Sequence, residues 1–511
     1  MKKITDFMTL VCLELDRILV PAMTENGAVG FSGSGKPLVD ITYQIPSYRT
    51  DKVSALHLFW KAFTLNAIMA MKWLFFVRDP RQGLGERDLF RVLFFNILQK
   101  AKFTDKDYEY FFSLIEEYGR WDDILPALHI KALKPIAVKI INKQLVKDLD
   151  AITANKPVSL LAKWLPSVNT SSGSTRKTAR ILAADLGFSE KDYRVMLSDL
   201  RRYIGVCEKH MSAKEWNVIN YEHVPSKANI RYSKAFARND TERRQLYIKD
   251  LVEGKKKINA SVVFPHEILH ALLEASHTDR DQISLYEEMW KYLPNKNISN
   301  TMVVADGSGS MLTNNIGNTK ITALEVANAL AIYCSERNSD VYKDKYITFS
   351  EHPQFVDFGH CNTLLDKYRY AQDYNEVANT NIEAVFKLIL DTAKHNDVKQ
   401  EDLPARILII SDMEFDEGTS GRTDISLFHE IQENYEEHGY TLPKLIFWNV
   451  NSRTNVIPIT EAENGVCLVS GFSVNTLDMV MSDKLDPEAV LLETLNKERY
   501  DKVIIPSLLA E

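Results

Sequence analysis

The chain has 511 residues, of which 45% are hydrophobic and 26% charged. This composition fits a folded protein with two or more domains and excludes a disordered chain. No apolar run approaches the roughly 18 residues that a membrane helix needs, and the N-terminal apolar residues are interrupted by Asp6, Glu14 and Asp16. We therefore expect a cytoplasmic protein with no signal peptide and no membrane contact.

The charge is unevenly divided along the chain. Residues 1–300 hold 45 Lys and Arg against 35 Asp and Glu, a net charge of +10, whereas residues 301–511 hold 17 against 34, a net charge of -17. The basic excess concentrates in 151–250, with 18 basic and 10 acidic residues. This asymmetry predicts an anionic partner for the first half and a cation or a basic partner for the second, or else only solvated helix faces. The five cysteines are scattered with no CxxC pair, so we expect reduced packing residues.

Residues 1–50 contain no motif that predicts a function, and their glycine-rich stretch GAVGFSGSGKPLVD (27–40) is expected to be a loop. From 51 to 298 the apolar spacing predicts successive amphipathic helices joined by short turns. Examples are ALHLFWKAFTLNAIMAMKWLFFV, RDLFRVLFFNILQK and DYEYFFSLIEEYG. Helices in this number, with few strand signals, predict an all-α, HEAT-like repeat domain.

One helix of this region carries a metalloprotease-like spacing, His266-Glu267-x-x-His270. Pro265 suits the first position of a helix, which places Glu267 in the first turn, where a carboxylate acts as a cap and the helix dipole opposes a dication. We expect the start of a packing helix. A zinc hydrolase stays open as a remote alternative, with a third ligand taken from Glu287 or Glu288.

After residue 299 the pattern changes to short buried strands that alternate with helices. The predicted strands are MVVA, KYITF, ARILIIS, KLIFWNV and GVCLVS, and the predicted helices include ITALEVANALAIYCSERN, TNIEAVFKLILDTAKH and DISLFHEIQENYEEHG. This alternation predicts a mostly parallel sheet with helices on both faces, a doubly wound α/β, Rossmann-like domain over 299–511. Ligands of such sheets bind beyond the carboxyl ends of the strands.

Oxygen-bearing side chains follow two of these strands. Asp306, Ser308 and Ser310 alternate in DGSGS after the first strand, Asp412 follows ARILIIS, and Thr380 precedes a helix between them. Carboxylates and hydroxyls are hard ligands that suit Mg²⁺, Mn²⁺ or Ca²⁺ better than zinc. The glycines should let the loop bend so that its alternate residues converge. The alternative is a simple turn, a helix cap and a strand-end acid.

The same five residues resemble the metal-ion-dependent adhesion site (MIDAS) of von Willebrand factor A domains, in which DxSxS is followed by a distant Thr and a distant Asp. The resemblance covers about residues 299–511. It implies that Ser308 and Ser310 contact the ion directly and that Thr380, Asp306 and Asp412 do so directly or through water. It also implies an open coordination position for an acidic group of a protein partner.

The helical half contains DPRQGLGERDLF, YGRWDDIL, LLAKWLPS and YRVMLSDLRRYIGVCEKHMSAKEW, and the run that continues to residue 269. Together these strings resemble the TROVE module of Ro autoantigens, and more closely a bacterial and viral family of TROVE-like chains that end in a von Willebrand A domain. The resemblance implies a cytoplasmic ribonucleoprotein component that binds small non-coding or misfolded RNA without catalysis.

The basic excess lies where this resemblance places an RNA-binding surface. We expect phosphate contacts from Arg176, Lys177, Arg180, Arg201, Arg202, Arg231, Lys234, Arg238, Arg243 and Arg244. The interleaved aromatic residues could stack on unpaired bases, although core packing is the more usual role of any single one; they are Tyr193, Tyr203, Tyr232 and Phe236.

Other functional classes fit the sequence less well. No GxxxxGK[ST] motif supports a P-loop, and no second carboxylate cluster marks a two-metal hydrolase. We therefore expect a binding protein and no enzyme. The main alternative is a protein-interaction scaffold in which the basic residues serve acidic partners.

Overall fold

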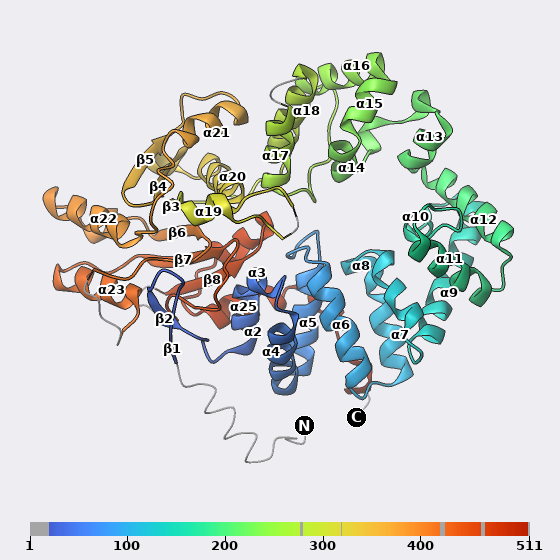
Figure 1. The fold of residues 1–511 in the computed structure, drawn as a ribbon, viewed down its shortest axis with the longest axis horizontal. Coiled ribbons are helices and arrows are strands. Elements are labelled where there is room, and N and C mark those ends of the chain that lie inside the picture. Colours follow the sequence, from blue (N-terminus) through green and yellow to red (C-terminus); the bar gives the residue numbers. More distant parts are fainter. Residues whose placement is uncertain (1–19, 276–278, 318, 420–424, 461–464, 509–511) are drawn as a thin grey trace. The chain divides into compact units, whose positions relative to one another are not determined.

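The computed structural model describes residues 20–275, 279–317, 319–419, 425–460 and 465–508, which form two compact units (Figure 1). The sheet unit comprises residues 20–70 and 251–499, and the helical unit comprises residues 71–250 and 500–508. This division differs from the linear boundaries expected near residues 50 and 298. Residues 51–70 and 251–298, at the two ends of the expected helical region, belong to the sheet unit. The chain thus leaves the sheet unit after residue 70 and returns to it at residue 251.

The sheet unit contains a six-stranded sheet in the order β5-β4-β3-β6-β7-β8. All neighbouring strands are parallel except β5, which pairs antiparallel with β4 at one edge. The five predicted strands are confirmed, whereas β5 was not predicted because PQFVD is short and begins with proline, which is usual only at the edge of a sheet. The strands are β3 (Thr301–Asp306), β4 (Lys345–Phe349), β5 (Pro353–Asp357), β6 (Arg406–Ser411), β7 (Lys444–Asn449) and β8 (Val466–Ser470).

Helices alternate with these strands, which confirms an α/β arrangement. Helix α20 is buried along almost its whole length and contacts β3, β4 and β6. The helices that follow residue 251 are α17 (Pro265–Ala275), α18 (Arg280–Lys291), α19 (Gly309–Thr313), α20 (Ala323–Glu336), α21 (Leu364–Gln372), α22 (Glu383–His395), α23 (Leu427–Glu437), α24 (Leu477–Val480) and α25 (Pro487–Leu495).

The N-terminal part of the described chain is an integral part of the sheet unit. Strands β1 (Pro21–Met23) and β2 (Val29–Phe31) form an antiparallel hairpin, and Phe31 bridges to Ile457. The loop expected for residues 27–40 is therefore wrong, because long-range pairing orders β2 and Pro37 starts a helix. The helices here are α2 (Pro37–Tyr43), α3 (Ile45–Tyr48) and α4 (Lys52–Leu65), and α2 packs against β8 and α25.

The helical unit contains helices and no strand among its described residues. The predicted helix at 55–77 is divided at Asn66, whose extended backbone ends α4 and whose side chain caps α5 at the N–H of Met69. The helices from there on are α5 (Ala67–Arg78), α6 (Asp88–Lys100), α7 (Asp105–Ser113), α8 (Ile115–Tyr118), α9 (Lys134–Thr153), α10 (Leu161–Trp164), α11 (Gly173–Asp185), α12 (Glu190–Ile204), α13 (Cys207–Ala213), α14 (Ser226–Arg231), α15 (Ser233–Asn239) and α16 (Thr241–Val252).

A buried ion network joins the first helices of this unit. Asp123 accepts hydrogen bonds from Arg78 Nε and Arg91 Nε, each at 2.7 Å, and its side chain is fully buried. Arg120 lies over the ring of Trp164 at 4.0 Å and pairs with Asp122. The YGRWDDIL string is therefore an architectural element. In the described part of the chain, every helix is too short or too polar to cross a bilayer.

Candidate functional site

The predicted metal ligands lie at the carboxyl edge of the sheet, where β3 and β6 are neighbours. The parallel register pairs Ala305 with Ile410, so the residues that end the two strands lie side by side. Ser411 Oγ donates a hydrogen bond to Asp306 Oδ2. The fold thus brings together two acids, Asp306 and Asp412, that are more than a hundred positions apart.

The DGSGS segment turns sharply from β3 into α19. Ser308 N–H donates to Asp306 Oδ1 at 2.9 Å, and the hydroxyl oxygens of Ser308 and Ser310 lie 3.2 Å apart. The reason for glycine at 307 differs from the expected one, since its φ is not positive. A Cβ at Gly307 would lie 2.8 Å from Thr348 Oγ1 and 2.9 Å from Asn375 Oδ1, so a side chain there would force these groups to shift.

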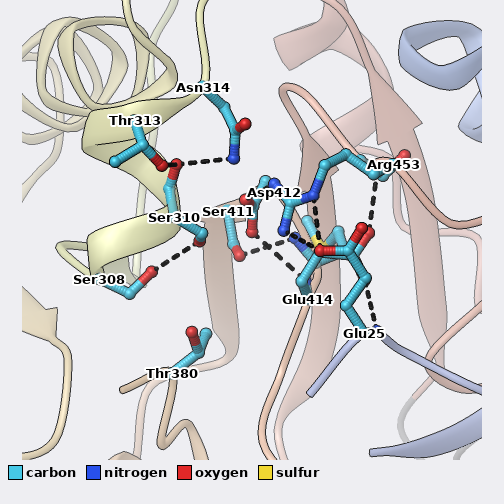
Figure 2. A network of polar contacts seen from close by, with 12 residues as sticks. Glu25, Ser308, Ser310, Thr313, Asn314, Thr380, Ser411, Asp412, Glu414 and Arg453 are labelled. Atoms are coloured by element: carbon cyan, nitrogen blue, oxygen red, sulfur yellow. Dashed lines mark hydrogen bonds and ion pairs between the residues drawn. The ribbon is translucent and has the colours of Figure 1, made fainter. Parts of the chain in front are cut away.

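Thr380 comes to the same place from the loop before α22. Its N–H donates to Asp416 at 2.9 Å, and its hydroxyl accepts from Asn26 Nδ2 at 3.3 Å. Figure 2 shows Thr380 across from Ser308 and Ser310, with Asp412 on the β6 side. These four residues therefore surround one region at the sheet edge, and the hydrogen bonds of Asp306 to Ser308 and Ser411 connect the fifth predicted residue to it.

The candidate site is a buried set of carboxyl and hydroxyl side chains. Asp306, Ser308, Thr380 and Asp412 are at most 1% exposed, and Ser310 is half-buried. Burial, and then the charge of Asp412, raises the pKa of Asp306. Burial also raises the pKa of Asp412, which Arg453 opposes. Two buried carboxylates beside hydroxyl groups are the ligand type that a hard dication stabilises, so these residues fit Mg²⁺.

Three further residues of the site were not found from the sequence. Arg453, in the loop after β7, places Nη1 2.9 Å from Asp412 Oδ2 and donates through Nε to Glu25 at 2.8 Å. Glu414 is fully buried and accepts from the N–H groups of Glu25, Arg453 and Thr454. The rule that ligands bind at carboxyl strand ends indicates Arg453, but no local signal indicates Glu25, which reaches the site through the β1–β2 hairpin.

Most of the predicted RNA-binding residues are exposed on the helical unit. Arg176, Lys177 and Arg180 lie on α11, Arg202 on α12, Arg231 on α14, Lys234 and Arg238 on α15, and Arg243 on α16. Arg180, Arg202 and Arg243 pair with nearby acids. Five of the predicted residues, all in the described part of the chain, are exposed and make no ion pair, namely Arg176, Lys177, Arg231, Lys234 and Arg238. Helix α11 packs against α12, and α14 packs against α15. The basic residues on α11 and α12 therefore form one group, and those on α14 and α15 form a second.

Arg244 is a structural residue, contrary to the prediction. It is 2% exposed, and its guanidinium lies 4.8 Å from the ring centre of Tyr221, 5.3 Å from Phe236 and 5.5 Å from Tyr247. Nη1 also donates to Asn229 at 3.1 Å. A cation enclosed by rings cannot reach a phosphate from this position, so Arg244 leaves the candidate RNA-binding set.

Arg201 also has a structural role. Its half-buried guanidinium donates to the carbonyls of Ala162 and Leu165 and to Ser167 Oγ, at 2.7 to 2.8 Å. These bonds hold the chain around α10 onto α12 and occupy both terminal nitrogens. Arg201 is therefore unsuited to a phosphate contact, whereas its neighbour Arg202 faces solvent.

The aromatic residues considered for base stacking divide in the same way. Tyr193 and Phe236 are fully buried, and the Tyr193 hydroxyl donates to the Pro166 carbonyl at 3.0 Å. Tyr232 is half-buried, and Tyr203 is 38% exposed. Tyr203 is therefore the best placed of the four to contact a base.

The HExxH motif does not assemble a metal site. Helix α17 begins at Pro265 as expected, and Glu267 accepts from Phe264 N–H at 3.0 Å as a cap. His266 is buried against Phe472, whereas His270 Nδ1 pairs with Glu325 at 3.2 Å. Among the described residues, three or more His, Cys, Asp or Glu side chains bring their ligand atoms together in one place, at the exposed residues Glu351, His352 and Glu376. The HExxH residues are not part of that group.

Two family models match the chain. Residues 300–503 match a domain of unknown function, DUF7788, and residues 120–302 match another, DUF2828. An uncharacterised protein, L728, of Acanthamoeba polyphaga mimivirus is 29% identical over 95% of this chain and 89% of its own length. The crystal structure of the Ro (RSR) protein of Deinococcus radiodurans aligns with a TM-score of 0.39 and 15% identity, over 88% of this chain and 92% of that chain.

Proposed function

We propose that the chain is a non-catalytic, Ro-like RNA-binding protein with a Mg²⁺-dependent site for an acidic protein ligand. The observation that carries the RNA part is the set of exposed cations without an ion pair on α11 and α15, in a stretch with 18 basic and 10 acidic residues. Solvated Lys and Arg side chains that form no ion pair with neighbouring acids are available to phosphates. Tyr203 offers a stacking surface for an unpaired base.

Nitrocellulose retention of labelled single-stranded RNA across a salt series tests this proposal. The quadruple variant Arg176→Ala, Lys177→Ala, Lys234→Ala and Arg238→Ala should bind more weakly. Its plot of log affinity against log salt should be shallower by about 0.7 for each lost phosphate contact. The matched control replaces four exposed lysines of the sheet unit that make no ion pair, Lys320, Lys343, Lys394 and Lys484, by Ala. It should retain RNA as the unaltered chain does.

Absence of retention at low salt would refute RNA binding and would favour the protein-interaction scaffold. Equal weakening in the quadruple variant and in its control would show that RNA binding is non-specific and does not depend on α11 and α15. Either result leaves the metal site to be tested separately.

The sheet edge supports the metal-dependent part of the proposal. Asp306, Ser308, Ser310, Thr380 and Asp412 would hold the ion, and Mg²⁺ bound there would supply an electrophilic position for a carboxylate of a partner. Ions that bind only the folded state raise its stability. Mg²⁺ should therefore raise the melting temperature of the unaltered chain.

The variant Asp306→Ala should lose the stabilisation by Mg²⁺ and keep RNA retention. Asp402→Ala, at an exposed acid of the same unit, is the control and should keep both. Mg²⁺-independent melting of the unaltered chain would refute the metal site. Loss of RNA retention in a folded Asp306→Ala variant would refute the division of the two functions between the units.

A further inference from the structure

We infer that Arg453 is a built-in competitor for the proposed metal site, so that an ion binds only by displacing the guanidinium from Asp412. This inference rests on the metal site of the proposed function. Asp412 Oδ2, which a cation at this edge would approach, already accepts from Arg453 Nη1 at 2.9 Å. A guanidinium and a divalent ion cannot both hold one buried carboxylate oxygen without strong repulsion.

The Arg453 side chain bridges two acids of different accessibility. The Asp412 side chain is fully buried, whereas the Glu25 side chain is 48% exposed, and Arg453 contacts both while remaining 27% exposed itself. Figure 2 shows Arg453 between Asp412 and Glu25. The Arg453 side chain can therefore leave Asp412 and stay paired with Glu25, and it loses only the contact with Asp412.

The backbone around this bridge is held in place independently. Glu414 Oε1 accepts from the N–H groups of Arg453 and Thr454 at 2.9 and 2.8 Å, and Oε2 accepts from Glu25 N–H at 3.0 Å. Thr24 Oγ1 also donates to the Phe415 carbonyl at 2.6 Å. Displacement of Arg453 from Asp412 thus needs only a rotation of its side chain, and neither the hairpin nor the loop after β7 has to move.

Glu25 has an opposite effect to Arg453 in this scheme. Glu25 already pairs with Arg453 while Asp412 shares the guanidinium. After displacement Asp412 no longer shares it, so the pair with Glu25 strengthens, and Glu25 favours ion binding through Arg453 and not by contact with the ion. Removal of the Arg453 charge should therefore tighten ion binding, and removal of the Glu25 charge should weaken it. Because Glu25 acts through Arg453, its effect should vanish when Arg453 is absent.

Calorimetric titration of the full chain with Mn²⁺ tests this scheme in a double-mutant cycle. Arg453→Gln should lower the Kd by about tenfold or more, the scale expected when a charge-assisted contact no longer has to be broken. Glu25→Gln alone should raise the Kd several-fold. In the Arg453→Gln background, Glu25→Gln should leave the Kd unchanged. Asp306→Ala provides the baseline without ion binding.

The outcomes are distinguishable. Equal Kd values for Arg453→Gln and the unaltered chain would overturn the competition and leave the metal site intact. An effect of Glu25→Gln that persists without Arg453 would overturn the role given to Glu25. No Mn²⁺ binding by any variant would overturn both the metal site and this inference. If Arg453→Gln does not fold, Arg453→Lys, which cannot hold two carboxylates with a planar fork, should still bind Mn²⁺ more tightly.

Discussion

Glu414 should be one of the most important side chains for the stability of the sheet unit. Its carboxylate is fully buried and accepts hydrogen bonds from four donors: the N–H groups of Glu25, Arg453 and Thr454, and the Thr454 hydroxyl. These bonds tie the β1–β2 hairpin and the loop after β7 to the end of β6. Replacement of Glu414 by Ala leaves every one of these donors without its acceptor.

A hydrogen bond to a charged group contributes about 1.5 kcal/mol or more to stability. Four such bonds, reduced for partial access of water to the vacated space, give a loss of about 4–6 kcal/mol for Glu414→Ala. In a unit of this size, about 2 °C of melting temperature corresponds to 1 kcal/mol, so the transition of the sheet unit should fall by about 10 °C. Glu414→Gln keeps one acceptor oxygen but turns an amide N–H₂ toward a donor, and should cost about 2 kcal/mol.

Differential scanning calorimetry of the full chain measures both effects. Glu401→Gln, at an exposed acid of the same unit, is the control and should melt within about 1 °C of the unaltered chain. A Glu414→Ala variant that melts as the control does would refute the reasoning, because the four donors would then find other acceptors at no cost. Equal losses for Glu414→Ala and Glu414→Gln would show that the negative charge matters more than the number of bonds.

Further predictions concern the pH dependence of stability and the structural role of Arg244. Burial raises the pKa of Asp40 from 3.8 to about 6, so the folded state binds the proton more tightly than the unfolded state, and stability should fall as pH rises from about 4 to above 6. By linkage this loss is about 3 kcal/mol, and Asp40→Asn should remove it. The variant should therefore melt higher than the unaltered chain at pH 8 but not at pH 4.5, and an equal difference in melting temperature at both pH values would contradict the raised pKa of Asp40. The hydrogen bond to Glu325 raises the pKa of His270, so its contribution is complete below about pH 6.5 and is lost as pH rises through the folded pKa; the melting difference between His270→Gln and the unaltered chain should therefore shrink at high pH, and a constant difference would argue against the ion pair. Arg244→Ala should lower the melting temperature of the helical unit by several degrees through lost ring contacts and a cavity, whereas Arg238→Ala should leave it unchanged and weaken RNA retention; the reverse pattern would restore Arg244 as an RNA contact.

The local patterns of the sequence were sufficient for the type and order of most elements. The period of apolar residues identified β3, β4, β6, β7 and β8 and the helices α20, α22 and α23, since short-range periodicity reflects which face of an element is buried. The chain order of Asp306, Thr380 and Asp412, together with the rule for carboxyl strand ends, placed the candidate metal ligands at one edge. Pro265 and Glu267 predicted the start of α17 because capping depends on residues three positions apart.

The tertiary structure alone decided which charged groups are available. Arg244 and Arg238 look alike in the sequence, yet three rings, two of them from other segments, enclose the first, and the second faces solvent. Glu25 belongs to the candidate site only because β2 is anchored to residue 457 and the N-terminal segment pairs with residues 380–416. Burial and ion pairing depend on which segments pack together, and the residues concerned can be 41 positions apart, as Asp412 and Arg453 are, or 428, as Glu25 and Arg453 are. Local sequence patterns carry no record of such contacts.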